Sequence, residues 1–393
     1  MTRTTRALID TTAVVANLTR ARALAPASKV LACIKGNGYG HGLESVAAAL
    51  ATHADGFAVA FIDEAIQVRK TGNGPCDQIP VVILEGPHHR EEIAVAARSG
   101  FTLMICSEQQ VEWLEGSPPD QRPDCWLKLD TGMHRLGIRP DYAKQLYARI
   151  RTALAERTII PGAATGATVI CTHFSDADNP DPERTEAQIQ RLLESTNGMD
   201  IVRSCANSAG VLAHPSSHMD WVRPGYMLYG GSPLAHRSAL DCGLKASMSF
   251  VAPIIALREV GPGDSVGYGN RWTARRPSVI ATIAAGYADG YPRLAADGTK
   301  VWIDGQVCPL AGRVSMDMLM VDVTDLPQAT VGMLAELWGE NISVDYVAKQ
   351  AGTIGYELLA GLPDRLPRVA RSSVDLPQHM QQATQQTMIE NSA

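Results

Sequence analysis

The chain has 393 residues, which at about 150 residues per domain predicts two or three domains, although a single α/β barrel can be larger. Hydrophobic residues make up 45% of the chain and charged residues only 19%, below the roughly 25% of an average globular protein. This composition excludes a disordered chain, and the length allows a large buried core. The formal net charge of −6 gives no electrostatic reason to bind nucleic acid or an anionic membrane.

Targeting signals are not expected in this sequence. No apolar run approaches the roughly 18 residues that cross a bilayer. Asp10 interrupts the apolar stretch near the N-terminus, and no small-residue cleavage site follows it. None of the eight cysteines forms a CxxC pair, and most lie in apolar runs. We therefore expect a cytoplasmic protein with buried free thiols rather than a disulfide or metal framework.

The first 238 residues alternate short apolar runs with longer amphipathic segments. Strand–helix alternation repeated about eight times favours parallel strands joined by right-handed crossovers. It predicts an α/β fold, a (β/α)₈ TIM barrel rather than a doubly wound sheet, over residues 1–238. The strand candidates are 29–35, 56–62, 80–86, 101–106, 126–130, 168–174, 201–207 and 219–230.

The character of the sequence changes after Gly230. Apolar runs at 248–260, 278–288, 300–312 and 318–326 are separated by turn signals without intervening helices. This pattern predicts antiparallel strands and a mostly-β C-terminal domain over residues 239–375. The last residues, 376–393, contain five Gln and weak periodicity, and we expect a polar tail.

A lysine followed by four alternating glycines is the most informative local pattern. Lys35 ends the first apolar strand, and the segment KGNGYGHG occupies residues 35–42. At the carboxyl end of a barrel strand, where catalytic groups gather, a partly desolvated neutral amine can form a Schiff base with a carbonyl. The glycines leave backbone N–H groups open to a phosphate. The alternative is a glycine-rich turn with a surface lysine.

The segment KGNGYGHG resembles the cofactor-lysine motif of alanine racemases, which use pyridoxal 5′-phosphate (PLP). The family form has alanine where this chain has Gly36 and Gly38. Further resemblances, in family order, are LKLDTGMHRLG, THFSDAD, ANSAG, VRPGYMLYGGSP, VGYGNRW, AAGYADGYPR, GRVSMDM and TIGYELL. The resemblance runs from about residue 5 to residue 370. It implies a homodimeric enzyme that interconverts L- and D-alanine, supplying or using D-alanine for peptidoglycan.

The resemblance also implies catalytic roles. Lys35 would hold PLP covalently and act as the base on one face of the substrate's α-carbon, with Tyr268 as the base on the other face. A free tyrosine is a poor base at neutral pH, so cations must favour its phenolate, and His173 and Arg223 would form that network. Arg223 would face the pyridine nitrogen and leave it unprotonated. Without the resemblance, His173 would be interpreted as structural and Arg223 as a surface ion-pair residue.

Cofactor and substrate contacts follow from the same motifs. Lys128 matches a lysine that is often carbamylated; the alternative is a buried ion pair with an aspartate. Arg135 and the backbone N–H of Met316 would bind the substrate carboxylate, with Asp317 beside Met316 in the substrate pocket, although SMD alone could be an ordinary turn. The other PLP contacts would be Tyr39, Asn207, Ser208, Gly225, Tyr226 and Tyr356.

Two alternatives to alanine racemisation remain open at this point. One is a serine or broad-specificity racemase, or a decarboxylase, on the same fold. Phe174 and Tyr356 favour the bulky pocket of the alanine type. The other is a non-catalytic PLP-binding homeostasis protein. Proteins of that kind resemble the barrel alone, so the second domain carrying Tyr268 argues against this alternative.

Overall fold

The computed structural model describes residues 3–70, 74–157 and 168–371. They form two compact units, one of residues 14–245 and one that combines the described parts of 1–13 and 246–393. The tail predicted for residues 376–393 lies outside the described residues.

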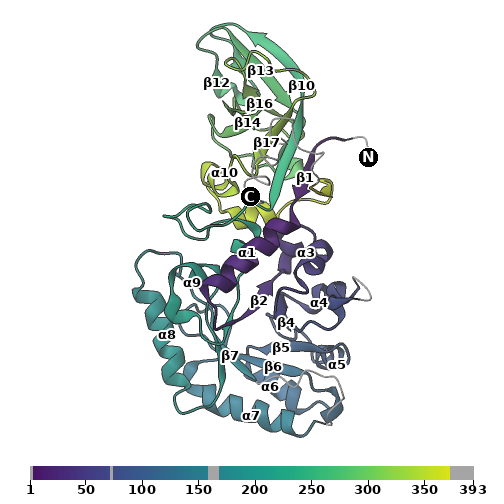
Figure 1. Ribbon diagram of the computed structural model, residues 1–393, viewed down its shortest axis with the longest axis vertical. Coiled ribbons are helices and arrows are strands. Elements are labelled where there is room, and N and C mark those ends of the chain that lie inside the picture. The colour runs from purple at the N-terminus through teal and green to yellow at the C-terminus, as the bar shows by residue number, and fades with distance from the viewer. Residues whose placement is uncertain (1–2, 71–73, 158–167, 372–393) are drawn as a thin grey trace, which may run out of the picture. The chain divides into compact units, whose positions relative to one another are not determined.

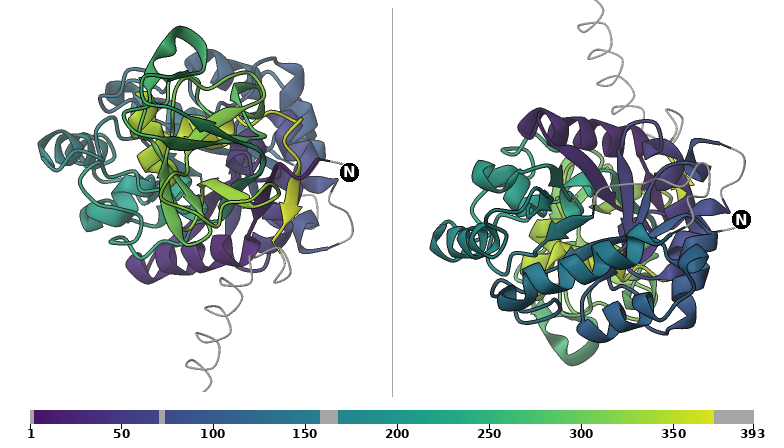
Figure 2. Two further views of the ribbon diagram at one scale, coloured as in Figure 1. Left: turned by 90° about the horizontal axis from the view of Figure 1, so that it is seen from above. Right: turned by 90° about the horizontal axis from the view of Figure 1, so that it is seen from below.

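Residues 14–245 form a closed barrel of parallel strands surrounded by helices, as predicted (Figures 1 and 2). Each strand pairs with the next, and β9 pairs with β2 to close the barrel. The strands are β2 (Lys29–Cys33), β3 (Gly56–Val59), β4 (Val81–Ile83), β5 (Phe101–Ile105), β6 (Asp124–Lys128), β7 (Val169–Cys171), β8 (Val202–Ser204) and β9 (Trp221–Val222). The main helices are α1 (Thr11–Leu24), α3 (Leu43–Leu50), α4 (Ile62–Arg69), α5 (Glu91–Arg98), α6 (Glu108–Glu115), α7 (Ala143–Ala155), α8 (Glu183–Ser195) and α9 (Ser208–Ala213).

Side chains from successive strands fill the barrel interior. Leu31, Ala58, Val82 and Met104 belong to one buried cluster, together with Trp126. Parallel strands are covered on both faces, which explains why their sequences are nearly continuous apolar runs. Three cysteines belong to the same cluster, and all eight cysteines of the chain are free and buried, as predicted.

The second unit is built mainly from antiparallel strands, also as predicted. Its long central strand β10 (Met248–Val260) pairs with β1, β13 and β17. The other strands are β1 (Arg6–Ile9), β11 (Ser265–Val266), β12 (Trp272–Thr273), β13 (Ser278–Ile283), β14 (Lys300–Ile303), β15 (Gln306–Pro309), β16 (Leu319–Asp322), β17 (Leu334–Trp338) and β18 (Arg368–Ala370). Two helices, α10 (Val344–Ala351) and α11 (Gly355–Ala360), complete it.

The first strand of the chain belongs to this second sheet. The division drawn from the sequence counted residues 1–238 together, whereas β1 lies between β10 and β18. It is antiparallel to β10, with Arg6 opposite Val251, and parallel to β18, with Leu8 opposite Val369. Hydrogen bonds on both sides of a four-residue strand hold it there. Within the described ranges, no helix is long and apolar enough to cross a membrane.

Candidate active site

Four predicted site residues lie at or just beyond the carboxyl ends of barrel strands. Lys35 follows β2, Lys128 is the last residue of β6, His173 follows β7, and Arg223 comes directly after β9. Because the strands are parallel, these ends meet at one rim of the barrel, the rim that carries the active site in enzymes of this architecture. The structure therefore gathers these four residues from widely separated parts of the chain.

The segment after Lys35 is a left-handed turn. Gly36, Asn37, Gly38 and Tyr39 have φ angles of 63°, 55°, 61° and 50°. The left-handed conformation costs a residue with a side chain roughly 1–2 kcal/mol, whereas glycine adopts it readily. Glycine at positions 36 and 38 therefore relieves strain at two of the four positions. The Asn37 side chain accepts a hydrogen bond from the backbone N–H of Leu43 at 2.8 Å, which ties the turn to α3.

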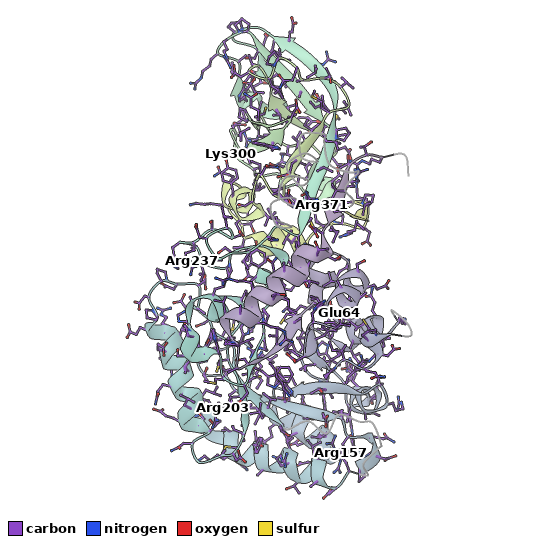
Figure 3. All side chains as sticks on the ribbon, in the orientation of Figure 1. Glu64, Arg157, Arg203, Arg237, Lys300 and Arg371 are labelled. Atoms are coloured by element: carbon purple, nitrogen blue, oxygen red, sulfur yellow. The ribbon has the colours of Figure 1, made fainter. Side chains whose placement is uncertain are left out.

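A buried carboxylate on the neighbouring helix α4 anchors this turn. Glu64, in the first turn of α4 and 8% exposed, is labelled in Figure 3. One of its oxygens accepts from the N–H of Gly36 at 2.7 Å, and the other accepts from the N–H of Ala60 at 2.8 Å. The amide next to Lys35 is thereby fixed to the end of β3. Glu64 was not predicted as a site residue, because its only signal in the sequence is that of an acidic residue at a helix start.

Tyr39 lies in a close-packed aromatic arrangement. Its ring stacks on Tyr229 with 4.7 Å between ring centroids, and the Tyr229 hydroxyl donates to the Cys33 carbonyl at 3.1 Å. Burial raises the pKa of Tyr229 well above its ordinary value, so this hydroxyl keeps its proton and remains a donor. A Cβ atom at Gly225 would lie 2.5 Å from the Tyr39 hydroxyl oxygen, so a larger residue there would force Tyr39 to move. Tyr229 lies within the VRPGYMLYGGSP motif, but the sequence analysis gave it no role.

Predicted phosphate contacts converge on one hydroxyl. The Ser208 Oγ accepts from the N–H of Gly225 at 2.9 Å and from the N–H of Met227 at 3.3 Å. Asn207 caps α9 by accepting from the N–H of Gly210 at 2.9 Å, so its side-chain oxygen also stabilises the helix. Tyr226 is buried in the same segment. Because Ser208 Oγ accepts the bonds from Gly225 and Met227, its own hydroxyl proton is the donor left to offer to an anion at the start of α9.

Arg223 is buried, with 5% of its surface exposed. One terminal nitrogen donates to Ser204 Oγ at 2.6 Å, and the other donates to the carbonyls of Thr172 and Cys205 at 2.6 and 3.1 Å. Its Nε donates no hydrogen bond, and its guanidinium forms no ion pair, within the described ranges. The alternative of a surface ion-pair residue is therefore wrong, and Nε remains a donor for a neutral acceptor.

Burial and nearby basic side chains act together on the pKa of His173. Burial lowers the pKa of His173 well below its ordinary value, and Arg223, Lys128, Arg135 and Lys35 lower it further. The imidazole is therefore neutral at physiological pH.

Burial also lowers the pKa of Lys128, which forms no ion pair with any carboxylate that the structure describes. The alternative of a buried Lys128–Asp pair is not found. Arg135 is exposed in the loop after β6.

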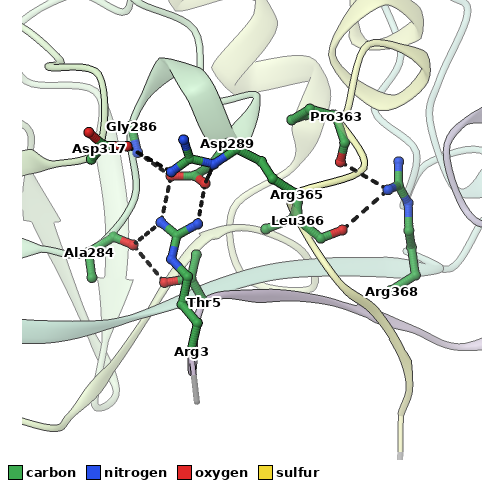
Figure 4. A network of polar contacts seen from close by, with 10 residues as sticks. All are labelled: Arg3, Thr5, Ala284, Gly286, Asp289, Asp317, Pro363, Arg365, Leu366 and Arg368. Atoms are coloured by element: carbon green, nitrogen blue, oxygen red, sulfur yellow. Dashed lines mark hydrogen bonds and ion pairs between the residues drawn. The ribbon is translucent and has the colours of Figure 1, made fainter. Parts of the chain in front are cut away.

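The remaining predicted site residues lie in the second unit. Tyr268 stands between β11 and β12 with 72% of its surface exposed, and Met316 is 54% exposed. Asp317 accepts a hydrogen bond from Arg365 at 2.7 Å (Figure 4). Tyr356 lies in α11 and is half-buried.

Comparison with known proteins identifies the family. The sequence profile of the alanine racemase N-terminal domain matches residues 9–233, and that of the alanine racemase C-terminal domain matches residues 247–370. An alanine racemase from Stutzerimonas stutzeri is 44% identical over 362 residues, which cover 92% of this chain and 98% of the relative.

Solved structures agree with the sequence matches. The biosynthetic alanine racemase from Pseudomonas aeruginosa superposes with a TM-score of 0.86 at 44% identity, covering 94% of this chain and 100% of that structure. An alanine racemase from Bartonella henselae, solved with covalently bound pyridoxal phosphate, gives a TM-score of 0.80 at 29% identity, covering 93% of this chain and 99% of that one. Both domains, their order and nearly the whole length are shared, and the chain belongs to the alanine racemase family.

Proposed function

We propose that this PLP-dependent racemase interconverts L- and D-alanine with two bases, Lys35 and Tyr268, on opposite faces of the substrate's α-carbon. The observation that carries the proposal is the position of Lys35 at the barrel rim. There it begins a left-handed turn. Lys35 and Arg223 both lower the pKa of His173, so both lie close to that imidazole. An assay that resolves the two enantiomers, run on alanine, serine and larger amino acids, tests the proposal. Faster turnover of serine than of alanine would contradict it.

The residues of the barrel rim fit PLP. Its phosphate would be held by Ser208 and Gly225, with Tyr39, Asn207, Tyr226 and Tyr356 as further contacts. The close approach of Gly225 to the Tyr39 hydroxyl supports this, since it brings two of these contacts side by side. Lys35 would bind PLP covalently. When bound, PLP withdraws electrons from the α-carbon and makes its proton acidic.

Arg223 would donate from Nε to the pyridine nitrogen. A guanidinium keeps its own proton, so the ring nitrogen would stay neutral and the electron pair would remain largely at the α-carbon. That favours return of a proton to the α-carbon over side transamination. Arg223, a cation that lowers the pKa of His173, would supply the positive charge that stabilises a phenolate at Tyr268.

The substrate carboxylate would be bound by Arg135 and the Met316 N–H, with Asp317 beside them in the pocket. We propose a homodimer in which Tyr268, Met316 and Asp317 of one subunit complete the site begun by Lys35 of the other. The high exposure of Tyr268 and Met316 in the single chain supports this arrangement. A cytoplasmic enzyme that supplies or uses D-alanine for peptidoglycan is the expected setting.

Arg223→Glu should slow racemisation by on the order of 10²-fold and increase side transamination. A carboxylate would favour protonation of the ring nitrogen, so more of the electron pair would leave the α-carbon. Coupled detection of released pyruvate measures the side reaction. Arg223→Lys, which keeps a cation, should release no extra pyruvate. Wild-type racemisation in Arg223→Glu would show that residue 223 does not face the nitrogen.

Lys128 should be carbamylated by carbon dioxide. Its buried amine lacks a carboxylate partner among the described residues, and its lowered pKa favours the neutral, nucleophilic form. Attack on carbon dioxide forms an N–C bond and releases one proton, leaving an anion able to pair with Arg135. With ¹³C-labelled bicarbonate, the wild type should show a carbamate resonance that Lys128→Ala lacks and Lys349→Ala retains. No resonance in the wild type would contradict the prediction.

A further inference from the structure

Asp289, in the AAGYADGYPR motif, is fully buried in the second unit yet carries no assigned role. Figure 4 shows three groups that donate to its carboxylate. Arg3 donates from both terminal nitrogens, one of them at 2.8 Å. Arg365 Nε donates at 2.9 Å, and the N–H of Gly286 donates at 3.0 Å. A buried carboxylate is tolerated only when it is paired and hydrogen-bonded, and two guanidinium groups provide that compensation here.

The turn that Asp289 stabilises, residues 286–290, lies directly on the Ser315–Met316 backbone. The N–H of Tyr287 donates to the Ser315 carbonyl at 3.0 Å, and the N–H of Ala288 donates to the Met316 carbonyl at 2.9 Å. The approach is so close that a Cβ atom at Gly286 would lie 2.3 Å from the Ser315 oxygen and 2.4 Å from the Met316 oxygen. Asp289 accepts from Gly286 and thereby fixes the start of this turn.

These contacts determine where the Met316 N–H points. The Ser315 carbonyl and the Met316 N–H belong to one planar trans peptide group, so they point in opposite directions. Because Tyr287 holds the carbonyl, the N–H is aimed away from the turn. The adjacent side chain is held as well, since Arg365 also donates to Asp317 at 2.7 Å. One arginine thus links buried Asp289 to half-exposed Asp317.

We infer that Asp289, together with Arg3 and Arg365, is a positioning residue that aims the Met316 N–H at the substrate carboxylate and fixes the neighbouring Asp317 side chain. The inference rests on the proposed role of Met316 in binding that carboxylate. It follows that Arg3, near the N-terminus, contributes indirectly to substrate binding through Asp289. Arg3 also donates to the Ala284 carbonyl at 3.1 Å, and nearby Thr5 donates to the same oxygen at 2.6 Å.

Asp289→Asn and Arg3→Ala test the inference, with Arg371→Ala as the matched control. Arg371, labelled in Figure 3, pairs with Glu340 at 2.7 Å in the same unit. Its loss should lower stability without changing the Met316 segment. Arg3 is 34% exposed, so Arg3→Ala keeps the test available if Asp289→Asn does not fold. Arg365→Lys should give an intermediate effect, since an ammonium cannot reproduce both guanidinium bonds.

The first readout is amide hydrogen exchange of residues 315–317 in the protein without PLP. The second is inhibition of the holoenzyme by propionate, a carboxylate of alanine's size without an amine. Both test variants should exchange faster and bind propionate at least about tenfold more weakly, because a misplacement of about 1 Å can cost on the order of 10²-fold. The KM for alanine should rise more than kcat falls. Arg371→Ala should match the wild type in all of these.

Two results would overturn the inference, and they differ in meaning. Unchanged exchange at residues 315–317 would show that Asp289 and Arg3 do not position this segment. Faster exchange with unchanged propionate inhibition would show that the segment is positioned but that Met316 does not bind the carboxylate, which would overturn the proposed role of Met316 as well.

Discussion

Lys35→Ala should abolish both covalent attachment of PLP and racemisation, while the barrel stays folded. The side chain is half-buried at the rim and belongs to no core cluster, so its removal should cost little stability. Loss of a general base alone typically costs 10²–10⁴-fold, and loss of the covalent attachment adds to this. Borohydride reduction followed by peptide mapping should place the pyridoxyl group on Lys35 in the wild type and find none in the variant.

Lys128→Ala is the informative control for this experiment. Lys128 is the other lysine close enough to depress the pKa of His173, and it lies at the end of β6 on the same rim. Its variant should keep the pyridoxyl label on Lys35. Label on Lys128, or on any other lysine in the wild type, would contradict the assignment of Lys35.

The sequence predicted the barrel well because each strand is a local apolar run bounded by turns. Strand β2 begins at Lys29, where the run begins, and each of the eight predicted runs overlaps a strand of the closed barrel. Strand β6 begins two residues before its run, at Asp124. In the second unit, β10 matches the predicted run 248–260 at both ends. The alternation of glycines after Lys35 likewise pointed to an unusual backbone, which is a left-handed turn.

Long-range partners could not be predicted in the same way. The β1 strand pairs with residues near positions 250 and 369, and its own sequence does not indicate which strands it will pair with. Glu64 and Asp289 are ordinary acidic residues until folding buries them against backbone N–H groups. Patterns of hydrophobicity report burial, but they do not report which buried polar groups meet. The positioning residues of this enzyme are visible only in three dimensions.

Tyr268→Phe should impair the two directions of proton transfer unequally. The change removes only a hydroxyl from a side chain that is 72% exposed, so folding and PLP binding should survive. Abstraction from L-alanine should fall by about 10²–10⁴-fold, because Tyr268 is its base, while Lys35 should still exchange the α-proton of D-alanine with deuterium oxide. Mass spectrometry of each enantiomer measures the exchange. Tyr346→Phe, which removes a hydroxyl from α10, should leave both exchange rates unchanged.

Mixing two inactive variants tests whether the bases come from different subunits. In a heterodimer of Lys35→Ala and Tyr268→Phe subunits, a shared-site arrangement gives one of the two sites both wild-type bases. Activity should therefore return after subunit exchange, which mass spectrometry of the intact dimer can verify. No recovery in verified heterodimers would show that both bases of a site belong to one chain. Equal loss of exchange from both enantiomers in Tyr268→Phe would instead indicate a single base, since independent bases on opposite faces must fail separately.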